Sequence, residues 1–251
     1  MIDWGTHFAR VAQRPTDLSV RLEVADLVEE RAPSFAEFIR NGVALSGLAL
    51  GDPARRERGR TERILLRQGV RKILIEPHAD WIRGGHVHGG WLEGGTVDTA
   101  AFMREAESRF AVLPLLHLDL SDLGDRLDAL LDAPWLPRLR SLALPGAALS
   151  DGDAKRMAGS PALRGIRYLG LGHSDIGLEG LEAFAASPHL GALQRLELGP
   201  DAPRHEREPW SDQGAVIGFD VCPTADRLER MYGSRPWLNR ADEHPAFRTA
   251  L

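Results

Sequence analysis

The sequence predicts an α/β fold, in which a short solenoid with parallel strands inside and helices outside follows an all-helical N-terminal domain. Three observations support this: a repeated hexad in the second half, helical periodicity in the first half, and 43% hydrophobic with 27% charged residues over 251 positions. That composition is typical of a folded globular chain, and the length suits one elongated or two compact domains. We expect the helical domain at 1–90, the solenoid at 91–199 and a C-terminal cap at 200–251.

The first 90 residues are expected to be helical because their apolar residues recur at helical spacing. The predicted helices cover 3–13, 16–31, 34–43 and 53–66, with Thr16 or Asp17 and Ser34 as N-caps and Pro53 in a first turn. On the second helix, the predicted apolar stripe consists of Leu18, Leu22, Val24 and Leu27. The segment 70–77 combines a strand-like I-x-I pattern with helical spacing toward Trp81, and we favour a helix there.

Four hexads in the second half share leucine or isoleucine at positions one, four and six. They are LLHLDL at 115–120, LRSLAL at 139–144, IRYLGL at 166–171 and LQRLEL at 193–198, with central leucines 24, 27 and 27 residues apart. A second marker keeps the same phase: Pro134, Pro161 and Pro188 each precede the next central leucine by eight residues. Two markers in one register indicate a structural repeat.

Each repeat is predicted to be a strand followed by a helix. In an extended hexad, Leu118 and Leu120 point inward while His117 and Asp119 point outward. Between hexads the apolar residues recur at helical spacing, and Ser150 or Asp151 is a candidate helix start. Such units bury their apolar faces only by stacking on neighbours. A first, degenerate unit is expected to have its strand at 91–97 and its helix in the residues that follow.

These repeats resemble the leucine-rich repeat family, and the 27-residue period with a full helix is similar to its ribonuclease-inhibitor-like class. The asparagine that usually follows the hexad is absent, because Leu123, Ala147 and Ser174 occupy its place. We therefore expect backbone turns or Ser174 to replace the usual buried asparagine ladder.

Residues 21–42 resemble the short N-terminal repeat-companion domain of bacterial leucine-rich repeat proteins. The matching residues are Leu22, Ala25, Asp26, Glu29, Glu30, Arg31, Glu37, Phe38, Ile39 and Arg40. Leu27 stands where that family usually has tryptophan, and 34–36 replace a glycine-containing turn. The resemblance implies an interaction role and no reaction; an inhibitor, immunity or scaffold protein is the concrete form that it suggests.

The predicted function is therefore non-catalytic binding of a protein partner, not identified by the sequence, through the concave face of the repeats. The predicted partner-binding residues are His117, Asp119, Arg140, Ser141, Arg167, Tyr168, Arg195 and Glu197. Tyrosine and arginine are enriched at binding hot spots. The small residues Ser141, Ala143 and Gly170 are expected to leave a shallow hollow beside Tyr168. The alternative is that these side chains are only the solvated side of a short sheet.

A second class of function is metal binding or an enzymatic accessory role that uses His78, His86 and His88. Two histidines at i and i+2 of a strand share a face, and a third ligand would come from His78, Asp80 or Glu93. The sequence has no G-x-S-x-G elbow, no P-loop and no dinucleotide fingerprint, and Cys222 has no nearby histidine. We therefore expect no catalytic residue, no cofactor and no metal.

The net charge of −5 and pI of about 6.0 argue against a nucleic-acid partner. The basic run 54–63 is the exception, but it lacks aromatic residues, and Glu57 and Glu62 are spaced to pair with its arginines. No apolar run is long enough to cross a membrane, and the first residues do not resemble a signal peptide. One cysteine, Cys222, is compatible with a reducing cytoplasm.

The C-terminal cap is expected to protect the apolar end of the solenoid. Residues 215–221 have strand composition and 224–233 have helical composition, and Trp210, Trp237 and Phe247 are suited to covering apolar surface. Whether this segment also binds a partner is left open, as is the oligomeric state.

Overall fold

The computed structural model describes residues 3–49, 52–198 and 223–237, and it shows a mixed α/β chain. The chain divides into two compact units. Among the described residues, the first unit contains 3–49, 52–96 and 105–117, and the second contains 97–104, 118–198 and 223–237. No helix in the described part is both long and apolar enough to cross a membrane.

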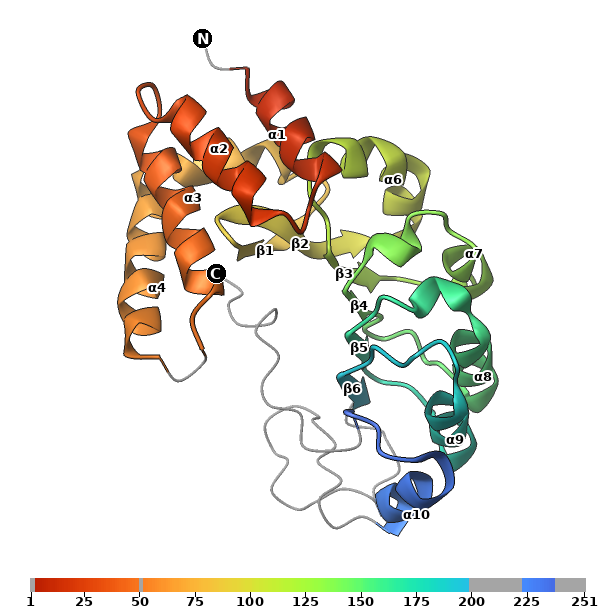
Figure 1. The fold of residues 1–251 in the computed structure, drawn as a ribbon. Helices are drawn as coiled ribbons and strands as arrows, with labels where there is room; N and C mark the ends of the chain where they lie inside the picture. The colour runs from red at the N-terminus through yellow and green to blue at the C-terminus, as the bar shows by residue number, and fades with distance from the viewer. Residues whose placement is uncertain (1–2, 50–51, 199–222, 238–251) are drawn as a thin grey trace. The chain divides into compact units, whose positions relative to one another are not determined.

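Helices dominate the beginning of the first unit, as the sequence predicts (Figure 1). They are α1 (Trp4–Gln13), α2 (Leu18–Val28), α3 (Pro33–Ser46), α4 (Pro53–Leu65), a wide helical turn (Leu66–Val70), α5 (Arg71–Leu74) and a 3-10 turn (Glu76–His78). Asp3 and Asp17 cap α1 and α2, and their carboxylates accept hydrogen bonds from the backbone N–H groups of Thr6 and Ser19. The predicted N-cap of the third helix is wrong, since Ala32 holds that position and Ser34 lies inside the helix.

The buried face of α2 differs from the predicted stripe. Val20, Val24 and Val28 are buried, whereas Leu22 is 37% exposed and Leu27 is 60% exposed. The buried face follows positions 20, 24 and 28 because α3 packs there. At the surface, Arg40 of α3 also contacts α2. Its guanidinium donates hydrogen bonds of 2.7 Å to Asp26 and of 2.8 Å to each carboxylate oxygen of Glu29.

The prediction of helix alone over residues 1–90 is wrong at its end, where a β-hairpin forms. Strand β1 (Arg83–His88) pairs antiparallel with β2 (Trp91–Asp98). Glycine explains this, because Gly90 turns the hairpin with a φ of 72°, in the left-handed region. A Cβ atom on Gly42 of α3 would lie 2.0 Å from the backbone N of Gly90. Backbone therefore packs against backbone here, and only glycine fits.

Among the described residues, six strands form one sheet in the order β1-β2-β3-β4-β5-β6. The remaining strands are β3 (His117–Ser121), β4 (Ser141–Ala143), β5 (Tyr168–Leu171) and β6 (Arg195–Leu198), and the pairs β4/β5 and β5/β6 are parallel. The remaining helices are α6 (Thr99–Val112), α7 (Leu127–Leu131), α8 (Asp151–Gly159), α9 (Leu178–Ala186) and α10 (Pro223–Tyr232), with 3-10 turns at Leu136–Arg138 and Pro161–Leu163. All four hexads thus contain the predicted strands.

The register of the second unit repeats every 27 residues. Leu142 pairs with Leu169, and Leu169 pairs with Leu196; all three are buried. Backbone turns repeat as well, because the fourth residue after each of the first three central leucines has positive φ: 55° at Asp122, 70° at Gly146 and 61° at His173. Helices α7, α8 and α9 lie along the same side of these strands (Figure 1).

Polar contacts hold the turns and helices of the second unit. The Ser174 hydroxyl is buried and donates to the carbonyl of Leu171, three residues earlier in the chain, at 2.5 Å. The Ser187 hydroxyl donates to the carbonyl of Ala158 at 2.5 Å. Asp151 accepts hydrogen bonds from the backbone N–H groups of Gly177 and Gly180 at 2.7 and 2.9 Å. Asp151 of one repeat therefore caps the helix of the next.

The described part of the predicted C-terminal cap packs on α9. Helix α10 is followed by Gly233, whose φ is 79°, and Leu228 and Trp237 are buried. The Arg227 side chain forms a 2.7 Å ion pair with Glu182 of α9. The other residues predicted for the cap, Trp210, Phe247 and 215–221, lie outside the described residues, as does Cys222.

Candidate binding surfaces

The parallel strands of the second unit bring two rows of predicted site residues together. Ser141, Tyr168 and Arg195 are aligned across β4, β5 and β6, and Ala143, Gly170 and Glu197 form the row beside them. Because neighbouring residues of a strand point to opposite faces, these side chains lie on the face away from the central leucines. We name this surface the strand face.

Tyr168, Arg195 and Glu197 form a packed polar cluster on the strand face. The Tyr168 hydroxyl donates to the Glu197 carboxylate, and Arg195 forms an ion pair with the same carboxylate. The Arg195 guanidinium also lies 5.9 Å from the centre of the Tyr168 ring, within the range of a cation–π contact. Burial and the Glu197 charge raise the pKa of Tyr168, so the phenol stays neutral and keeps its proton for the hydrogen bond.

The predicted hollow beside Tyr168 is filled. Tyr168 is only 5% exposed, and Ser141 is fully buried. A Cβ atom on Gly170 would lie 3.0 Å from the Tyr168 hydroxyl, so the tyrosine itself occupies the space above the small residues. Beside this row, Arg167, which immediately precedes β5, is exposed, and several of the other predicted residues are half-buried. The half-buried residues are Asp119, Arg140, Arg195 and Glu197.

His117, predicted for the same row, has a different environment in the first unit. Its side chain is 9% exposed, and its Nε2 lies 3.3 Å from Oε2 of Glu93. Glu93 is itself buried and forms a 2.5 Å ion pair with the fully buried Arg21. The Arg21 guanidinium also donates to the carbonyls of Pro15, His88 and Gly89, at 2.6, 2.8 and 3.1 Å.

A β-bulge directs Glu93 into this buried cluster. His86 pairs with Gly94 and Val87 pairs with Leu92, so Glu93 is the additional residue of β2. Burial alone would raise the pKa of Glu93, but the nearby rings of His117 and His88 and the charge of Arg21 outweigh it and lower the pKa to about 2. Glu93 is therefore a buried carboxylate that stays charged.

The predicted group of His78, His86 and His88 does not form a metal site in the described part of the chain. His78 is buried against the rings of Phe8 and Trp81, and burial lowers its pKa. Nδ1 of His88 lies 3.4 Å from Glu93. Within the described residues, no group of three His, Cys, Asp or Glu side chains is arranged to hold a metal ion.

The basic run at 54–63 is partly anchored to α3. Arg55 donates to the carbonyl of Leu45 at 3.3 Å and also to the carbonyl of Leu48. Arg58 donates to the Asn41 side chain at 3.4 Å. Burial raises the pKa of Glu62, and the nearby charges of His88 and Arg63 offset only part of that rise.

The pairing of Arg21 with Glu93 is not predicted from the sequence, although a signal for it is present. Arg21 precedes Val24 and Val28 by three and seven residues, so helical spacing places it on the buried face of α2. Its partner was not recognisable, because Glu93 is directed inward by the bulge. Comparisons with protein-family models, curated proteins and solved structures found no match.

Proposed function

We propose that the second unit is a leucine-rich repeat solenoid of the ribonuclease-inhibitor-like class, and that the chain is a non-catalytic module that binds a protein partner. The 27-residue register of β4, β5 and β6 supports the first part, together with the recurring left-handed turn and the helix of each repeat. The salt bridges of Arg40 with Asp26 and Glu29 support a repeat-companion role for α2 and α3, since all three residues belong to the matching motif.

The observation that carries the binding proposal is the composition of the strand face. It combines the Tyr168 ring, the Arg195 guanidinium and the Glu197 carboxylate, with the Asp119 charge also acting on Tyr168 and with Arg140 and Arg167 just before β4 and β5, and the cluster is held by internal contacts. The Arg195–Glu197 ion pair and the hydrogen bond from Tyr168 hold these side chains in one arrangement before a partner arrives. Preorganised side chains lose less entropy on binding. Such a surface suits an inhibitor, immunity or scaffold protein.

The experiment compares two variants that each remove two positive charges from the second unit. Arg167→Ala with Arg195→Ala changes the strand face, and Lys155→Ala with Arg156→Ala changes helix α8. The residues of the control pair with Glu179, Asp128 and Asp153, but these contacts are on the exposed surface and contribute little to stability. Each tagged protein is used to capture partners from a lysate of its source cells, and captured proteins are quantified by mass spectrometry.

We expect a protein that is captured by the unchanged chain and by the α8 variant and is lost with the strand-face variant. Thermal unfolding of all three proteins checks that folding is retained. Equal capture by all three would show that the strand face does not bind. Capture of no protein in stoichiometric amount would refute the interaction role.

A further inference from the structure

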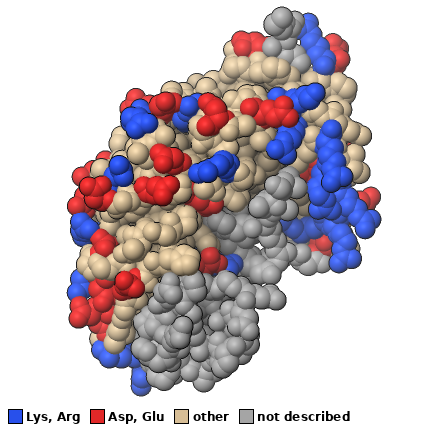
Figure 2. Space-filling model, turned by 180° about the vertical axis from the view of Figure 1, so that it is seen from behind, with Lys and Arg blue, Asp and Glu red and all other residues tan. Residues whose placement is uncertain are grey.

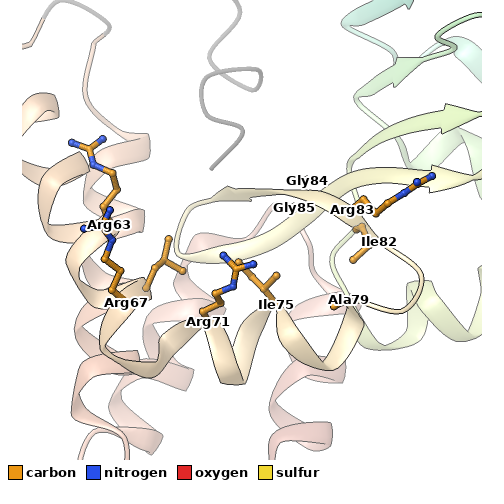
Figure 3. Close-up of a pocket in the computed structure, with 10 residues that line it drawn as sticks. Arg63, Arg67, Arg71, Ile75, Ala79, Ile82, Arg83, Gly84 and Gly85 are labelled. Carbon is orange, nitrogen blue, oxygen red and sulfur yellow. The ribbon is translucent and has the colours of Figure 1, made fainter.

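A pocket of about 470 Å³ in the first unit lies between α4, α5 and the start of β1. Four arginines line it: Arg63, Arg67, Arg71 and Arg83. Figure 3 shows Arg63 and Arg67 on one side, Arg71 beside Ile75 in the middle, and Arg83 above Ile82 on the strand side. The arginines thus come from three consecutive turns of helical chain and from a strand that follows it.

A kink in the chain forms the pocket. Gly69, in the turn between α4 and α5, has a φ of 115°, which side chains other than glycine rarely adopt. The helical chain therefore changes direction between Arg67 and Arg71. Residues before the kink and residues after it therefore line the same pocket.

The charge of the pocket is not balanced by its own lining. No Asp or Glu is among the residues that line it. Within the described part of the chain, no carboxylate forms an ion pair with Arg67, Arg71 or Arg83, and Glu62 is the acidic group whose charge interacts with Arg63. Figure 2 shows basic side chains gathered on the side of the molecule where α4 lies, with few acidic ones among them. Concentrated positive charge in a hollow attracts anions.

Apolar side chains make the remainder of the lining, among them Leu66, Ile75 and Ile82, and no aromatic residue is present. Single-stranded nucleic acids are usually held by aromatic rings on which bases stack, so this lining disfavours them. The volume is in the range of sites for small molecules, and guanidinium groups bind phosphate through paired hydrogen bonds. We propose that this pocket binds a small organic polyphosphate, whose phosphates contact the arginines and whose organic part rests on the apolar residues.

The test is isothermal titration calorimetry of the full chain with four probes, without divalent cations. The probes are adenosine triphosphate, inorganic pyrophosphate, adenosine and a hexaglutamate peptide. We expect adenosine triphosphate to bind at one site, pyrophosphate to bind more weakly because it lacks an organic part, and adenosine to show no binding. The peptide tests whether extended carboxylates fit instead.

Two matched variants assign the binding to the pocket. Arg67→Ala with Arg71→Ala removes two lining arginines, and Arg56→Ala with Arg60→Ala removes two exposed arginines of α4 that do not line the pocket. The first pair should weaken binding of adenosine triphosphate by about tenfold or more, as expected for lost charge-assisted hydrogen bonds. The second pair should leave it nearly unchanged.

Four results would overturn the proposal. One is no binding of adenosine triphosphate, and another is equal weakening by both variants, which would indicate only general attraction to a basic helix. Adenosine binding as tightly as its triphosphate would exclude the phosphates as the recognised group. Tighter binding of the hexaglutamate peptide would assign the pocket to an acidic protein segment.

Discussion

The ion pair between Arg21 and Glu93 is expected to contribute strongly to the stability of the first unit. Both side chains are at most 2% exposed, and Arg21 also donates to three backbone carbonyls. Removing one partner leaves the other charge buried without its counter-ion, which typically costs about 3–5 kcal/mol. We therefore expect Glu93→Gln and Arg21→Met each to lower the free energy of unfolding by that amount.

The double variant decides whether the charges act as a pair. Once one charge is gone, removing the second relieves an unpaired buried ion, so the two effects should differ from additivity by up to about 3 kcal/mol. The exposed pair Arg10–Glu23 of the same unit, with side chains 38% and 49% exposed, is the matched control. Arg10→Met together with Glu23→Gln should lower the free energy of unfolding by less than about 1 kcal/mol.

Urea denaturation followed by tryptophan fluorescence measures these free energies, because Trp91 is buried in the same unit. If Glu93→Gln and Arg21→Met each lower the free energy of unfolding by no more than the control variant does, the buried pair does not contribute strongly to stability. Additivity within about 0.5 kcal/mol would show that the two charges do not interact energetically.

Four further results are expected. The pKa of Glu93 is lowered from 4.5 to about 2, so the contribution of its charge to stability is complete above pH 4.5 and is lost as the pH falls toward 2. We therefore expect the difference in unfolding free energy between the unchanged chain and Glu93→Gln to become smaller as the pH is lowered from 4.5 to 2. Leu169→Ala should cost about 2–5 kcal/mol in a thermal or urea melt, and an unchanged midpoint would contradict the register of β5. Asp151→Ala should cost about 0.5–2 kcal/mol by removing the cap of α9, and an Asp151→Asn variant that retains the hydrogen bonds should lose less. Gly42→Ala places a Cβ atom 2.0 Å from the backbone of Gly90 and should lower the melting temperature by several degrees, whereas Gly59→Ala, in open space on α4, should not.

The strands and helices of the second unit could be predicted because each depends on a local pattern. The hexads alternate apolar and polar residues, and their central leucines are buried and paired as expected. The repeated prolines also act on the local chain, since α8 and α9 end at the C-caps Ser160 and Ser187, each directly before one of these prolines. Periodicity predicts such elements because the pleat and the helical turn have fixed repeats.

The hairpin at 83–98 and the burial of the strand face were not predictable in this way. Residues 83–90 contain four glycines and little apolar periodicity, and the hairpin packs there because Gly42 and Gly90 allow close backbone contact. For Tyr168, alternation predicts the face of the sheet correctly but not the exposure. The hydroxyl turns to Glu197 of the next strand, 29 residues away, and the ring covers Gly170.

The sequence by itself determined where most helices and strands lie along the chain and which leucines form the core of the second unit. Tertiary structure alone decided which charged residues meet: Arg21 with Glu93 across 72 residues, Asp151 with the helix of the following repeat, and four arginines around one pocket. The physical reason is the distance along the chain over which each effect acts. Backbone periodicity acts within a few residues of the chain, whereas a buried charge or a pocket depends on packing that brings distant segments together.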